Sequence, residues 1–100
     1  MILEAGVATV ELVVPVDAVL HARPAAAFVH AAAQFSCVLM LENLSNGHGP
    51  VNARSVISLL GLGASSGMRL RLIARGDGAQ DAVDALACIF VQLFGDIGAP

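Results

Sequence analysis

The sequence contains no lysine, tryptophan or tyrosine, and no apolar run long enough to cross a membrane. Mean hydropathy is nevertheless high, at +0.80, and 57% of the residues are apolar. A spanning helix needs about 18 or more consecutive apolar residues, and charged residues such as Asp17, Arg23 and Asp84 interrupt the richest stretches. The N-terminus lacks the basic start of a signal peptide and carries Glu4 and Glu11 instead. We therefore expect a soluble, cytoplasmic chain.

Positive charge and large aromatic rings are also scarce. Five arginines against eight acidic residues give a formal net charge of −3. Four phenylalanines are the only large aromatic side chains. Nucleic-acid affinity comes mainly from basic contacts to phosphates, and single-stranded bases stack on aromatic side chains. We therefore expect no nucleic-acid partner.

Cysteine is limited to Cys37 and Cys88, too few for a disulfide framework or a metal site. We expect both to be buried, reduced thiols. His30 and His48 have no Cys, Asp or Glu partners at the spacing of metal ligands, so we expect them on the surface. The sequence thus predicts neither a metal nor a cofactor.

Hydrophobic periodicity divides the chain into strands and helices. Residues 7–14 are rich in β-branched side chains and alternate in part, which is typical of a strand. Residues 68–74 alternate between apolar and polar side chains except at Ile73, which is typical of a strand with one wet face. The alanine-rich segment 24–35 is predicted to be a helix, because Pro24 suits a first turn and apolar residues recur at helical spacing. The remaining predicted elements are strands at 36–41 and 51–53 and helices at 55–60 and 79–94.

The predicted order is β-α-β-β-α-β-α, within one domain of residues 1–100 that has a core of about 7–95 and an N-terminal extension of 1–6. A loop rich in turn residues, 43–50, joins the second and third strands. This order belongs to the α+β class, with three helices packed on one face of a mostly antiparallel sheet. The opposite face of the sheet would then lie partly open to water.

The last predicted helix, 79–94, has an apolar stripe that should face the core. The members of this stripe are Ala79, Ala82, Val83, Leu86, Phe90 and Leu93. Four further apolar residues would then lie on the outer face of the helix, namely Ala87, Cys88, Val91 and Phe94. Such a face suggests self-association or a further partner, with packing against the N-terminal extension as the alternative.

The tetrapeptide His21-Ala22-Arg23-Pro24 is the most informative short segment. The histidine precedes a predicted helix whose first N–H groups lack internal partners, and such a helix start attracts anions. An unperturbed imidazole titrates near about pH 6.5, so uncharged His21 is available as a nucleophile toward phosphorus. Arg23 could clamp the oxygens of the transferred group. The plainer alternative is a capping or surface histidine.

Two segments resemble the motifs of one known family. Residues 19–26, Val-Leu-His-Ala-Arg-Pro-Ala-Ala, resemble the active-site motif G-[IL]-H-[AT]-R-P-A of HPr, the histidine-containing phosphocarrier of the bacterial phosphoenolpyruvate-dependent sugar phosphotransferase system. Residues 51–63 resemble the family's V-N-x-K-S-I-x-x-[VL]-[ML]-x-L-G motif. The family's open-faced β-sandwich, with a four-stranded antiparallel sheet and three helices, agrees with the order predicted above.

The resemblance implies a phosphoryl relay rather than an enzyme with turnover of its own. His21 would receive phosphate on Nδ1 from phosphorylated enzyme I and pass it to a IIA domain of a sugar permease, with Arg23 supporting the phosphate. Ser55 matches a serine that an HPr kinase/phosphorylase modifies in many bacteria, although a plain helix N-cap would explain it equally well. The positions that match the family's partner-docking surface are Ala26, Arg54, Val56, Ile57 and Leu60.

Departures from the family pattern keep a second function open. Val19 stands where the family carries glycine two residues before the histidine, and Arg54 replaces the usual lysine. The loop at 43–50 is also longer than usual. The altered loop before His21 and the apolar outer face of 79–94 motivate an alternative, namely an HPr-like regulatory or interaction module or a nitrogen-type phosphorelay protein.

Overall fold

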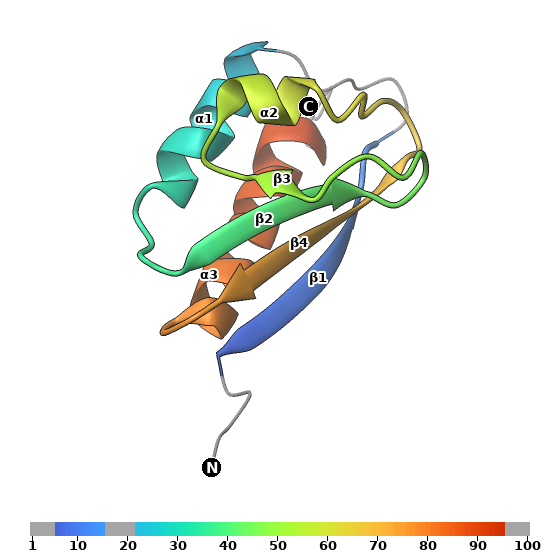
Figure 1. The fold of residues 1–100 in the computed structure, drawn as a ribbon. Helices are drawn as coiled ribbons and strands as arrows, with labels where there is room; N and C mark the ends of the chain where they lie inside the picture. Colours follow the sequence, from blue (N-terminus) through green and yellow to red (C-terminus); the bar gives the residue numbers. More distant parts are fainter. Residues whose placement is uncertain (1–5, 16–21, 96–100) are drawn as a thin grey trace.

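A four-stranded antiparallel sheet carries the helices on one of its faces (Figure 1). The computed structural model describes residues 6–15 and 22–95. The elements along the chain are β1 (Val7–Val13), α1 (Ala22–Ala32), β2 (Val38–Asn43), β3 (Val51–Asn52), α2 (Val56–Leu60), β4 (Arg69–Arg75), α3 (Ala79–Phe90) and a π-helical turn (Val91–Gly95). The predicted α+β class and element order are confirmed. None of the helices in these two ranges is long and apolar enough to cross a membrane.

Strand β4 lies inside the sheet, because it pairs with β1 on one side and β2 on the other in the order β1-β4-β2-β3. Its alternate residues Leu70, Leu72 and Ala74 are fully buried on the helix-covered face. Arg69 and Arg75 point to the opposite face and are exposed. The alternation read from the sequence therefore produces one dry and one wet face.

The connection between α1 and β2 differs from the prediction. Helix α1 ends at Ala32 rather than at Phe35, because Gln34 N donates to the carbonyl three residues back, at 3.1 Å, and Phe35 N does the same at 3.2 Å. These tighter bonds close the last turn and stop the helix. Residues 35–37 then lead into β2, which starts at Val38, two residues later than predicted.

The core lies between the sheet and the helices. Helix α3 contacts β1 and β4, and α1 contacts both α2 and α3 (Figure 1). Phe28 of α1 meets Phe90 of α3 edge to face, with ring centroids 6.3 Å apart. Such T-shaped aromatic pairs bury a large apolar area and add a favourable ring contact. This pair joins the two longer helices into one core.

The chain beyond α3 turns as a π-helix, and this changes which side chains are buried. Leu93, predicted in the core, is only half-buried. Phe94, predicted on the outer face, is 2% exposed, and its ring centroid lies 4.6 Å from that of Phe90 with the rings tilted by 36°. The wider i→i+5 turn rotates side chains away from the α-helical stripe. The prediction of an outward Phe94 is therefore wrong. Cys88 and Val91 are the exposed members of the predicted outer face.

The two cysteines differ in burial. Cys37 is buried and Cys88 is exposed, and both are free thiols. The prediction that both are buried is therefore correct for Cys37 and wrong for Cys88, which lies on the outward side of α3. His30 and His48 are exposed, as expected.

Replacing Phe94 tests this rearranged helix end. Phe94→Ala should lower the free energy of unfolding by about 3–5 kcal/mol, because the ring leaves a cavity beside Phe90. Val91→Ala, which trims a side chain that is 59% exposed, should change it by about 0.5 kcal/mol or less. Urea denaturation of both variants measures the difference. Equal effects would contradict the burial of Phe94.

Candidate functional site

The first turn of α1 carries Arg23, whose side chain is exposed. The helix is 11 residues long, starts at Ala22 and has no acidic residue in its first turn. Its first N–H groups have no intrahelical acceptor, and the helix dipole adds positive potential there. His21, the predicted phosphate acceptor, and the altered position Val19 lie outside the described residues. The described part of this site is therefore the end of α1 that attracts anions.

Ser55 is the N-cap of α2, as predicted. Its backbone is extended, with φ −120° and ψ 115°, and its hydroxyl oxygen accepts a hydrogen bond from Ser58 N at 3.1 Å. This bond satisfies one of the N–H groups that a helix start leaves without a partner. Because α2 has only five residues, this single cap is a large part of its local support.

The outward side of α2 is apolar. Ile57 is 83% exposed and Leu60 39% exposed, whereas Leu59 points inward and is 1% exposed. Val56 is half-buried against the core, so Ile57 rather than Val56 is the most prominent of the predicted docking side chains. Ala26 of α1 is exposed, and α1 and α2 are in contact (Figure 1). We refer to the exposed residues Ala26, Ile57 and Leu60 as the α1–α2 surface.

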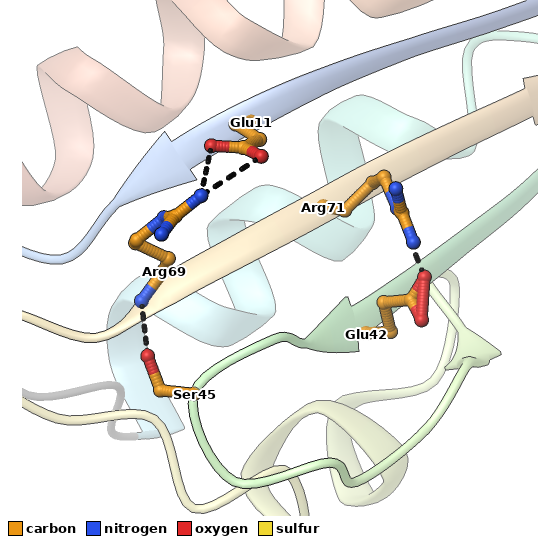
Figure 2. Close-up of polar contacts among 5 residues, drawn as sticks. All are labelled: Glu11, Glu42, Ser45, Arg69 and Arg71. Carbon is orange, nitrogen blue, oxygen red and sulfur yellow. Dashed lines mark hydrogen bonds and ion pairs between the residues drawn. The ribbon is translucent and has the colours of Figure 1, made fainter.

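Two arginines on the open face of the sheet are already paired. Arg69 of β4 lies 3.0 Å from a carboxylate oxygen of Glu11 on β1, and Arg71 lies 3.0 Å from Glu42 on β2 (Figure 2). These ion pairs connect neighbouring strands on the face that the helices leave open. The charges of Arg69 and Arg71 are therefore directed to neighbouring strands and not to the α1–α2 surface.

Arg54, predicted to contact a partner, is also engaged inside the molecule. It lies between β3 and the N-cap Ser55, and its Nη2 donates hydrogen bonds to the carbonyl oxygens of Phe35 and, at 2.8 Å, Cys37. Both acceptors belong to the connection between α1 and β2. The docking role of Arg54 stays a prediction, but the structure shows a main-chain contact that the sequence did not indicate.

The C-terminal end of α2 is supported by two asparagines that the sequence analysis treated only as turn residues. Asn43 and Asn46 both donate from Nδ2 to the carbonyl oxygen of Leu62, at 3.0 and 2.9 Å. Asn43 is 1% exposed, and its Oδ1 also accepts from Ser45 N at 2.9 Å. The only sequence signal for this role was the position of both asparagines in the loop at 43–50.

The described side chains suit the handling of an anion between two proteins. Arg23 and the start of α1 provide positive potential, and the adjacent α1–α2 surface provides exposed apolar area for a transient contact. In the part of the chain that the structure describes, no group of three His, Cys, Asp or Glu side chains is placed to hold a metal ion.

Comparisons with known proteins agree with this arrangement. Residues 8–92 match the family described as the PTS HPr component phosphorylation site. The multiphosphoryl transfer protein of Haemophilus influenzae is 32% identical over 77 residues, which are 77% of this chain but 15% of that protein. The HPr-like protein Crh of Bacillus subtilis is 41% identical over 73% of this chain and 81% of its own length. The crystal structure of HPr-C-His from Thermoanaerobacter tengcongensis superposes with a TM-score of 0.75 at 35% identity, covering 88% of this chain and 96% of that one.

The fold is thus that of an open-faced α+β sandwich of the HPr type. The chain belongs to the HPr family, the phosphocarrier proteins of the phosphotransferase system. The family resemblance read from residues 19–26 and 51–63 is thereby confirmed. The individual roles of His21, Arg23 and Ser55 remain predictions.

The cap at Ser55 can be tested by its effect on stability. Ser55→Ala leaves Ser58 N–H without its acceptor and should lower the free energy of unfolding by about 1 kcal/mol. Ser55→Asp keeps an oxygen acceptor at the N-cap and should retain most of the stability. Urea denaturation compares the two variants. An equal loss in both would contradict the capping role.

Proposed function

We propose that this chain is a phosphocarrier that accepts a phosphoryl group on His21 and passes it to a second protein. The observation that carries this proposal is the contact between α1 and α2. Helix α1 carries exposed Arg23 in its first turn, two residues after His21 in the sequence, and α2 presents exposed apolar side chains. By the family resemblance, the donor is phosphorylated enzyme I and the acceptor is a IIA domain of a sugar permease. The relay would operate in the cytoplasm and needs no cofactor.

The transfer would exchange one bond to phosphorus for another. Uncharged His21 attacks through Nδ1, and the new P–N bond forms as the bond between phosphorus and the donor breaks. Arg23 and the first N–H groups of α1 would offset the charge on the three oxygens of the moving group. Because phosphoryl transfer depends mainly on positioning and charge stabilisation, a small surface suffices when the partner supplies the rest of the site.

The distribution of acidic residues also supports docking at the α1–α2 surface. The described carboxylates lie elsewhere, on the open sheet face at Glu11 and Glu42 and around the start of α3 at Asp77, Asp81 and Asp84. A phosphorylated partner brings negative charge, and like charges facing each other across an interface oppose binding. None of these described acids stands in α1 or α2, so no carboxylate on either helix would oppose such a partner.

Regulation through Ser55 is a second candidate function. The position of Ser55 at the N-cap places a phosphate at the edge of α2 rather than in the core, so the fold would persist. The added negative charge would stand two residues from Ile57 and would oppose a phosphorylated partner. The 41% identity with the HPr-like protein Crh supports keeping this regulatory role beside the relay.

Mass measurement separates the two functions. Incubation with phosphoenolpyruvate and enzyme I should add one acid-labile phosphate to the wild-type chain and none to His21→Ala. Acid-labile phosphate that is still added to His21→Ala would contradict the relay function. Acid-stable phosphate that requires ATP and an HPr kinase, and that is lost in Ser55→Ala, would support the regulatory function instead.

A charge placed on α2 tests the docking surface. Ile57→Glu should lower kcat/KM for transfer from enzyme I by about tenfold or more, through a higher KM, because it buries a carboxylate in an apolar contact. Val38→Glu is the matched control, since Val38 is 53% exposed on the open face of the sheet. The free energy of unfolding of both variants should stay within about 0.5 kcal/mol of the wild-type value. Wild-type transfer by Ile57→Glu would show that α2 does not dock the donor.

A further inference from the structure

Arg54 connects two parts of the chain that are far apart in sequence. It follows β3 directly and precedes the N-cap of α2, and its own N–H donates to Asn52 Oδ1 at 2.9 Å. Its Nη2 reaches back 17 and 19 residues to the carbonyl oxygens of Cys37 and Phe35. The Arg54 side chain therefore connects the segment before α2 to the connection between α1 and β2.

The two hydrogen bonds from Arg54 are partly buried and supply a donor to carbonyl groups that lie outside the regular elements. Cys37 is 5% exposed, and a buried carbonyl without a partner is costly. Residues 35–37 lie beyond the last turn of α1 and before β2, where neither helix nor sheet bonds reach every acceptor. Hydrogen bonds from a guanidinium are also about twice as strong as those between neutral groups.

Helix α2 in turn needs external support. With five residues it is far too short to be stable alone. Its C-terminal end is held by Asn43 and Asn46 through Leu62 O, and its inner side by buried Leu59. At its N-terminal end, Arg54 supplies a side-chain hydrogen bond that reaches the α1–β2 connection.

We propose that Arg54 is a positioning residue, which fixes α2 against the end of α1 and thereby sets the shape of the α1–α2 surface. Its charge is directed to the main chain and is not offered to the partner. The consequence for transfer rests on the proposed phosphocarrier function, whereas the clamp itself does not. Two experiments separate these levels.

The thiol of Cys37 reports directly on the clamp. In a Cys88→Ser background, Cys37 is the only thiol, and a reagent such as dithionitrobenzoate reacts with it only when the α1–β2 connection opens. Arg54→Met should raise the native-state labelling rate of Cys37 by about tenfold or more, beyond any change in the global unfolding constant measured in urea. Arg54→Lys, with a shorter reach, should give a smaller increase and replaces Arg54→Met if that variant does not fold.

Arg69→Met is the matched control for this labelling experiment. It removes an arginine whose ion pair with Glu11 is exposed on the sheet, so its labelling rate should stay within about twofold of the wild type. A rate for Arg54→Met no higher than that of Arg69→Met, or no higher than global unfolding explains, overturns the clamp.

The salt dependence of transfer separates a positioning role from a docking charge. A cation that contacts the partner steers association and makes kcat/KM fall with ionic strength. If Arg54 positions α2, Arg54→Met and Arg54→Lys both raise KM and both keep the wild-type salt dependence. Near-wild-type transfer by Arg54→Lys with a flatter salt dependence in Arg54→Met would overturn the proposal. If His21 takes no phosphate, only the phosphocarrier function fails, and Cys37 labelling still decides the clamp.

Discussion

The structure depends on the pairing of β4 with a strand on each side. Leu70, Leu72 and Ala74 of this strand lie on one face, and three arginines with Ile73 lie on the other. Because a β-strand turns successive side chains to opposite faces, a slip of one residue would bury the arginines and expose the leucines. The alternation therefore sets the register with β1 and β2, and with it the single face on which the helices pack.

The helices leave the other face of the sheet uncovered, and charged side chains on that face pair with one another. Arg69 and Arg71 are paired with glutamates on the neighbouring strands, one on each side of β4 (Figure 2). The exposed Arg69–Glu11 pair adds little stability, whereas the Arg71–Glu42 pair is partly buried. The two pairs engage two of the five cations of a chain whose net charge is −3. Arg54 donates hydrogen bonds to main-chain carbonyl oxygens. Arg23, in the first turn of α1, is exposed.

Much of the fold could be predicted from the sequence, because period-2 alternation and apolar spacing in helices are local signals. The strands at β1 and β4 and the N-cap of α2 at Ser55 were predicted correctly for this reason. The π turn was not predicted, because its apolar residues also fit the spacing of a continuing α-helix, whereas the observed turn brings Phe94 against Phe90. The end of α1 was misplaced because apolar spacing continues past Ala32 into a connection that the helix does not reach.

The family, the order of the elements and the position of the candidate acceptor His21 before a helix could all be inferred from the amino-acid sequence, since they follow from residues that are near neighbours in the chain. The three-dimensional structure was needed to see which apolar side chains on α2 face outward and which long-range hydrogen bonds Arg54 and the two asparagines make near its ends. The physical reason is distance along the chain. Hydrogen bonds between residues 16 to 19 positions apart leave no periodic signal in the sequence, because their partners are neighbours only in the folded chain.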